Sequence, residues 1–153
     1  MTRPGQHLAH FNWAELVADS GSAEVAGFED TVPKINALAE RSAGFVWRDG
    51  DERERACAIG WSLFSDNPRL TASFSVWEDP QSLSDFVYAT VHGAFLRRAE
   101  EWFVRGTGQN HALWWVPKGH VPSMQEARDR VDLLLERGPS GTVFDFGYLE
   151  DQT

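Results

Sequence analysis

The chain lacks the residues on which several common classes of protein depend. Its single cysteine, Cys57, cannot form an internal disulfide, and it lies in the charged stretch DERERACA without a histidine nearby. We therefore interpret it as a free structural or surface thiol. Basic residues are also few, since 14 Lys and Arg stand against 23 Asp and Glu, giving a net charge of -9. Because binding to nucleic acid requires clustered Lys and Arg, we expect no nucleic-acid partner.

Long apolar runs and chemical signature motifs are absent as well. No segment reaches the roughly 18 apolar residues of a membrane span, and the N-terminus leads directly into polar residues. We expect a cytoplasmic protein with no membrane partner. The sequence has no GxGxxG, P-loop, HExxH, GxSxG or CxxC motif, and His7, His10 and His111 show no metal-ligand spacing. We therefore expect no metal and no cofactor.

Aromatic residues, in contrast, are abundant. The 153 residues include seven tryptophans and ten phenylalanines. Each buries a large apolar area, and a buried Trp also needs a partner for its N–H group. A chain of this length can form a core without disulfides, so we assign residues 1–153 to a single domain. The aromatic content predicts a large core, a ligand pocket, an interface, or all three.

Hydrophobic periodicity predicts alternating strands and helices. The expected strands are residues 7–12, 45–48, 70–77, 112–116 and 142–147. The expected helices are residues 25–42, with Pro33 causing a kink or a restart near residue 32, then 80–103 and 124–137. The apolar stripe of the second helix moves round its axis, which predicts a bend or break at Thr90 to Gly93. Residues 51–68 are predicted to be an irregular loop that contains two buried aromatics.

The order of the first six elements, β-α-β-β-α-β, matches the split βαβ, or ferredoxin-like, unit. The predicted fold is therefore α+β: an antiparallel sheet with helices on one face, followed by an extra C-terminal helix and strand. The other face of such a sheet would carry apolar and aromatic side chains. A homodimer packed sheet to sheet is the simplest way to cover them.

Two sets of motifs carry a resemblance to known proteins. The run AGFVW at 43–47, then SVWED at 75–79 with His92 about four helical turns on, resembles the dimeric α+β barrel superfamily that includes the antibiotic-biosynthesis monooxygenases. The fuller pattern FSVWED, LSDFVY, FLRRAEEWF, LWWVPKGHVPSMQEARDRV and GPSGTVFDF is similar to a domain-of-unknown-function family within it. The resemblance covers about residues 7–147. It implies a ferredoxin-like fold, dimerisation through the sheet, and an apolar pocket between sheet and helices in each subunit.

The resemblance also implies a range of activities. Members of the superfamily include cofactor-independent oxygenases of aromatic polyketides, haem-degrading oxygenases, other haem enzymes, lactone isomerases and cyclases. A shared fold does not select among them. The haem-degrading members use an Asn, Trp and His set; Asn12 and His92 lie in matching elements here, but Phe86 stands where that group has its tryptophan and the histidine spacing differs.

The candidate site residues follow from these patterns. His92 lies beside Gly93 at the expected helix break, where a neutral imidazole could take or relay a proton. Tyr88 or Asn12 would hydrogen-bond a substrate oxygen, so these three residues are the predicted catalytic set. Aromatic side chains suit the walls of a pocket for a planar ligand. The predicted substrate-binding residues are Trp77, Trp61, Trp115, Phe86 and His120.

Most of these residues also have a purely structural interpretation. For His92 it is a buried histidine that hydrogen-bonds to the backbone near the helix break. A tryptophan more often packs in a core than lines a pocket. Asn12 could cap the turn after its strand, and His120 could form turn hydrogen bonds before the next helix. The leading hypothesis is a cofactor-independent monooxygenase, isomerase or cyclase acting on a hydrophobic aromatic or polyketide-like molecule. The alternatives are a non-catalytic dimeric binding or structural protein, and a haem-binding protein with His92 as axial ligand.

Overall fold

The structure is a computed structural model that describes residues 2–93, 98–106 and 108–152, without the side chains of Val91 and His92. Its strands are β1 (Gln6–Glu15), β2 (Phe45–Arg48), β3 (Leu70–Trp77) and β4 (His111–Pro117). Its helices are η1 (Ala23–Val25), α1 (Ala26–Glu40), α2 (Glu52–Ala58), α3 (Ser62–Ser65), α4 (Pro80–His92), α5 (Ala99–Trp102), α6 (Met124–Arg137) and α7 (Phe146–Asp151). None of the described helices is long and apolar enough to cross a membrane.

The strands form one antiparallel sheet in the order β2-β3-β1-β4. β1 pairs with β3 on one side and with β4 on the other, so the first strand of the chain is central. This order is the one that a split βαβ unit produces. The predicted α+β, ferredoxin-like fold is therefore confirmed.

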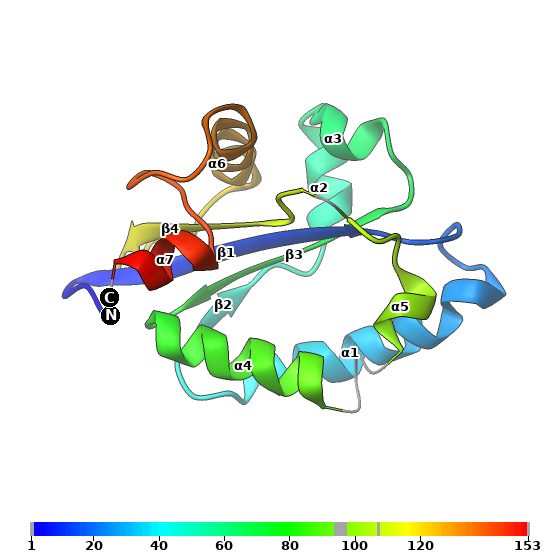
Figure 1. Ribbon diagram of the computed structural model, residues 1–153, viewed down its shortest axis with the longest axis horizontal. Helices are drawn as coiled ribbons and strands as arrows, with labels where there is room; N and C mark the ends of the chain where they lie inside the picture. The colour runs from blue at the N-terminus through cyan, green and yellow to red at the C-terminus, as the bar shows by residue number, and fades with distance from the viewer. Residues whose placement is uncertain (1, 94–97, 107, 153) are drawn as a thin grey trace.

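Both faces of the sheet are covered by helices of the same chain. Figure 1 shows α2, α3 and α6 on one side of the sheet and α1, α4 and α5 on the other. We call these the α6 face and the α4 face. Because side chains alternate along a strand, β1 points Ala9 and Phe11 to the α6 face and Leu8 and His10 to the α4 face.

The α6 face carries the main aromatic core. Phe11 packs edge-on against Phe74, with ring centroids 5.3 Å apart, and lies 5.5 Å from the ring of Trp61. The Nε1–H group of Trp61 donates to Asp132 of α6 at 3.1 Å, which ties the segment before α3 to α6. α6 closes this core with the buried side chains Met124, Ala127, Val131 and Leu134.

This arrangement corrects two expectations. Helices were expected on one face only, and residues 51–68 were expected to be irregular, but this segment forms α2 and α3 on the α6 face. Arg53 fixes the segment through its guanidinium, which donates to the carbonyl oxygens of Asn67, Leu70 and Phe64. The apolar face that a second copy was expected to cover is thus covered within the described chain.

The α4 face is organised by the junction between β3 and α4. Asp79 caps α4 by accepting a hydrogen bond from the Ser82 N–H at 2.8 Å, with Pro80 in the first turn. Trp77, at the end of β3, stacks on Phe86 with centroids 5.0 Å apart. α4 ends at His92, within the predicted break, and the short helix α5 follows after the undescribed residues 94–97.

Two further predictions differ from the structure. Residues 142–147 do not form a fifth strand: Phe144 makes only an isolated bridge to Leu113, and the Asp145 carboxylate caps α7 by accepting from Tyr148 N–H at 2.8 Å. Pro33 lies inside α1, which runs without interruption from Ala26 to Glu40, so of the two alternatives for this proline the restart near residue 32 is excluded.

Candidate functional site

A large cavity lies on the α4 face, between the sheet and the helices α1 and α4. Its volume is about 770 Å³, within the range of about 300–1,000 Å³ typical of small-molecule sites. The roof is largely apolar and comes from the helices, through side chains such as Val32, Ile35, Phe86 and Val87. The floor is polar and comes from the sheet.

The polar floor follows from strand alternation and strand register. His10 of β1 pairs with Ser75 of β3, and Asn12 pairs with Ser73 on one side and His111 on the other. All five side chains line the cavity. Three strands thus place hydrogen-bonding groups on one face, where most sheet positions would be apolar.

His10 is the most deeply buried ionisable group of the floor, with 4% of its surface exposed. Burial, with a smaller contribution from His111, lowers its pKa from 6.5 to about 3. The imidazole is therefore neutral at physiological pH, with one N–H donor and one acceptor nitrogen. Among the described residues neither ring nitrogen has a hydrogen-bond partner, so a ligand in the cavity is positioned to provide one.

His111 is held in one orientation by hydrogen bonds on both ring nitrogens. Its Nε2 accepts from the backbone N–H of Phe146 at 3.1 Å, which leaves Nδ1 as the protonated nitrogen, donating to Asn110 Oδ1 at 2.9 Å. Burial lowers the pKa of His111, while Asp145 opposes that change. His111 therefore fastens the start of α7 to the cavity wall, and the centroid of its ring lies 6.4 Å from that of His10.

Asn12 is oriented by a single contact across the strands. Its Oδ1 accepts a hydrogen bond from the Ser73 hydroxyl at 2.7 Å. Within the described chain its Nδ2 amide group has no partner, and Asn12 is only partly buried. The amide is thus available as a donor to a ligand oxygen.

The edge of the cavity near β2 carries charged side chains. Glu52, at the start of α2, accepts a hydrogen bond from the Phe74 N–H at 3.1 Å, because β2 has ended and leaves that group free. Burial raises the pKa of Glu52, and the Asp49 carboxylate raises it further, while backbone N–H groups and Arg48 act in the opposite direction. Arg48 itself donates to the Asp49 carbonyl at 2.9 Å and lies 3.7 Å from Glu40.

Of the predicted site residues whose side chains the structure describes, two line this cavity. Asn12 lies on the floor and Phe86 on the roof. Trp77 is fully buried behind Phe86: it stacks on that ring, and its Nε1–H donates to Ser75 Oγ at 2.9 Å. Trp77 thus supports the cavity wall from behind without lining it.

The other members of the predicted set lie elsewhere. Trp61 belongs to the core of the α6 face, on the opposite side of the sheet from this cavity. Tyr88 lies on the outer side of α4, with 67% of its surface exposed. His92 is the last residue of α4, two positions after Thr90 on the cavity wall, and its side chain lies outside the described residues.

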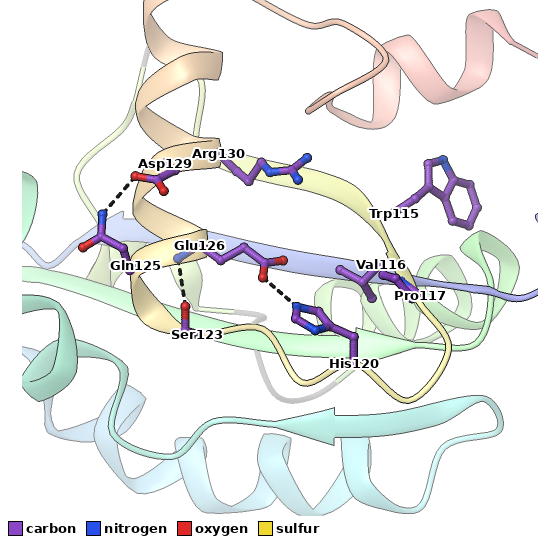
Figure 2. Close-up of a pocket in the computed structure, with 9 residues that line it drawn as sticks. All are labelled: Trp115, Val116, Pro117, His120, Ser123, Gln125, Glu126, Asp129 and Arg130. Atoms are coloured by element: carbon purple, nitrogen blue, oxygen red, sulfur yellow. Dashed lines mark hydrogen bonds and ion pairs between the residues drawn. The ribbon is translucent and has the colours of Figure 1, made fainter.

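Trp115 and His120 line a second, smaller hollow between the end of β4 and α6, with a volume of about 380 Å³. Figure 2 shows the Glu126 carboxylate pointing to the His120 ring, 2.7 Å from Nε2. The other oxygen of this carboxylate accepts from Trp114 Nε1–H at 2.8 Å. His120 therefore makes a local hydrogen bond next to the start of α6, well apart from the polar floor.

Sequence reasoning missed His10, His111 and Glu52 as site residues. His10 shares a strand face with Asn12, so alternation already places the two side chains together. The position of His111 in the site depends on strand register, and that of Glu52 depends on α2. Hydrophobic periodicity predicts neither the register nor this helix. Nowhere in the described residues do three or more His, Cys, Asp or Glu side chains gather as a metal site.

The fold and this cavity define an α+β, ferredoxin-like domain with a large cavity between sheet and helices. A family sequence model described as "Domain of unknown function (DUF3291)" matches residues 7–152. Because the match spans nearly the whole chain, the protein belongs to this family. The resemblance of the sequence motifs to a domain-of-unknown-function family is thereby confirmed. No curated protein sequence matches the chain.

Several solved structures are similar in fold. SnoaB, a cofactor-independent oxygenase from Streptomyces nogalater, has 17% identity and a TM-score of 0.45 over 77% of this chain and 99% of its own. A candidate antibiotic biosynthesis monooxygenase from Nitrosomonas europaea has 8% identity and a TM-score of 0.47, covering 78% and 96%. A protein of unknown function from the same organism has 14% identity and a TM-score of 0.43, covering 77% and 94%.

Proposed function

We propose that the protein binds a hydrophobic, planar small molecule in the cavity on the α4 face and acts on it without a cofactor, as a monooxygenase, isomerase or cyclase. The observation that carries this proposal is the division of one cavity of about 770 Å³ into an apolar roof and a polar floor. An aromatic ring system would pack under the roof while an oxygen substituent met the floor.

The floor offers suitable groups for such an oxygen. His10 is neutral and without a partner among the described residues, and Asn12 presents a free amide that Ser73 holds in place. Both would hydrogen-bond a carbonyl or hydroxyl group with little cost in reorganisation. The sequence resemblance to antibiotic-biosynthesis monooxygenases supports the same substrate class.

Binding can be tested by isothermal titration calorimetry with 2-naphthol, a planar apolar molecule with one hydroxyl group. We expect Val87→Trp, which fills the roof of the cavity, to weaken binding by about tenfold or more, and Asn12→Leu to weaken it by about 5–50-fold. Leu135→Trp adds the same bulk to an exposed position of α6 and should leave binding unchanged. Equal affinity in Val87→Trp and wild type would overturn the proposal.

Catalysis is tested separately with anthrone and 2-naphthol, by following their absorbance and the consumption of dissolved oxygen. The predicted role of His92 as the group that takes or relays a proton requires that His92→Ala lose turnover while circular dichroism shows an intact fold. Full turnover in that variant would contradict the role. Binding without any turnover would favour the non-catalytic alternative.

A further inference from the structure

We propose that Glu52 is the proton acceptor of the cavity, and that His10 and Asn12 hold the ligand oxygen on which negative charge develops. The ligand class is an apolar carbonyl compound with an enolisable C–H group next to the carbonyl. This inference rests on the proposed function and assigns the chemistry of the same cavity. It depends on where the three side chains lie and on what each can do there.

Glu52 is placed to act as a base. It lines the cavity at the edge of β3, and its carboxylate accepts hydrogen bonds from the Phe74 N–H at 3.1 Å and from its own backbone N–H. The charged groups around it are Arg48 at the end of β2 and Asp49 in the following turn. Because burial raises its pKa above the ordinary 4.5, the carboxylate is a stronger base than an exposed glutamate.

His10 is suited to the opposite role. A group whose pKa is lowered to about 3 is too weak a base to remove a proton from carbon. As a neutral imidazole, however, it donates an N–H hydrogen bond to an oxygen that gains charge in the transition state. Asn12 lies two residues along β1, so its amide projects from the same face about 7 Å further on.

Two consecutive residues of β3, Ser73 and Phe74, hydrogen-bond to Asn12 and to Glu52, respectively. The Phe74 N–H reaches Glu52, and the preceding residue, Ser73, reaches Asn12 through its hydroxyl at 2.7 Å. His10 lies on the strand next to Ser75, and neighbouring strands are about 4.8 Å apart. A ligand the size of two fused rings therefore spans the base at the edge and the donors on the floor.

The reaction step transfers a proton and needs no oxidant. The C–H bond next to the carbonyl breaks, and its electron pair forms the C=C bond of an enolate. The π electrons of the carbonyl move to its oxygen, which accepts hydrogen bonds from His10 and Asn12. The proton goes to the carboxylate of Glu52. Its return to the same carbon restores the ketone, and its return to another carbon of a conjugated ligand gives an isomer.

The test uses 2-tetralone, an apolar bicyclic ketone, and the full-length protein in D₂O. Nuclear magnetic resonance measures the rate at which deuterium replaces hydrogen next to the carbonyl, and calorimetry measures binding. We expect the protein to accelerate exchange, and Glu52→Gln to lower the catalysed rate by about 100-fold or more. His10→Phe and Asn12→Leu should each lower it by about 10–100-fold. Glu136→Gln, on the exposed side of α6, is the matched carboxylate control and should keep the wild-type rate.

The pH dependence of the wild-type rate, measured over the pH range in which circular dichroism shows a folded chain, provides a second readout. Exchange should increase with pH as Glu52 loses its proton, with a midpoint above 4.5, and this increase should vanish in Glu52→Gln. Glu52→Asp, which keeps a carboxylate on a shorter side chain, should retain part of the activity. A rate that is independent of pH between about 4 and 7 would overturn the role of Glu52.

The outcomes separate this inference from the proposed function. If 2-tetralone binds but its exchange is not accelerated, or if Glu52→Gln keeps the wild-type rate, then Glu52 is not the base. Either result leaves the proposed binding of a small molecule in the cavity unaffected. If His92→Ala abolishes exchange while Glu52→Gln does not, the role belongs to His92. If neither 2-tetralone nor 2-naphthol binds, the proposed function fails and this inference fails with it.

Discussion

At the scale of single residues, His10 links the cavity to the stability of the fold. Its pKa is about 3 in the folded chain and 6.5 when the side chain is free in solution. Below about pH 6.5 the unfolded chain therefore binds a proton that the folded chain does not. We expect this group alone to lower the free energy of unfolding by about 3 kcal/mol between about pH 7 and about pH 4.

Urea unfolding at a series of pH values measures this effect. His10→Gln is neutral at every pH, so its stability should fall less than that of the wild type over the same interval. His7→Gln removes a histidine from the same strand outside the cavity and should follow the wild-type curve. Parallel curves for the wild type and His10→Gln would show that His10 can be protonated in the folded state.

Glu126 has a structural role that can be measured in the same way. Its carboxylate accepts hydrogen bonds from Trp114 Nε1–H, whose side chain is fully buried, and from His120. Glu126→Ala leaves the Trp114 N–H without a partner in the core, which should cost about 2–3 kcal/mol. Glu136→Ala, on the exposed side of the same helix, should change stability by about 0.5 kcal/mol or less. A negligible effect of Glu126→Ala would mean that water replaces the carboxylate.

At the scale of elements, the turn between α1 and β2 depends on Gly44. Its φ is +81°, and a Cβ atom added there would lie 2.1 Å from Ser82 Oγ of α4. Gly44→Ala should therefore destabilise the fold by about 3 kcal/mol or more, through backbone strain and a clash with α4. Thermal or urea unfolding of the variant measures the loss.

The matched control is Gly138, which follows α6 with a φ of +77° and has open space around the added Cβ position. Gly138→Ala carries the backbone strain alone and should cost about 1–2 kcal/mol. In the Gly44→Ala background, Ser82→Gly removes the clash and should restore part of the stability. Equal losses in the two alanine variants would show that α4 moves aside without cost.

The elements with strong periodicity could be predicted from the sequence. The four strands of the sheet and the helices α1, α4 and α6 follow from alternation or from an apolar stripe, and the end of α4 follows from the drift of that stripe. α2 was missed because only Ala56 of its seven residues is buried, so it has no stripe to detect. The segment TVFDFG alternates like a strand, but Asp145 caps α7 and ends the extended conformation after one bridge.

The candidate site was predictable to a smaller extent. Alternation places His10 and Asn12 on one face, and the apolar stripe of α4 includes Phe86. Sequence patterns do not give the register that brings Ser73 and His111 beside Asn12, because strand register depends on pairing between distant segments. Nor do they reveal Glu52, whose position depends on β2 ending one residue before Asp49.

At the scale of the whole molecule, the additions to the split βαβ unit decide what the sheet can contact. The segment between β2 and β3 forms α2 and α3, and the segment after β4 forms α6. All three helices pack on the α6 face and bury its aromatic side chains. The expectation of a sheet-to-sheet dimer assumed that this face was open, and within the described chain it is covered.

Val131 tests whether the α6 face is the core of one chain. It is fully buried between α6 and the sheet, so Val131→Asp places a charge in the core and should cost about 3–5 kcal/mol. Leu135→Asp, on the exposed side of the same helix, should change the free energy of unfolding only slightly.

Because one chain builds this core, the difference in unfolding midpoint between Val131→Asp and the wild type should stay constant over a hundredfold range of protein concentration. If the face were instead an interface between two copies, the wild-type midpoint would rise with concentration. Val131→Asp would then be a folded monomer in sedimentation experiments, which would contradict the single-chain core.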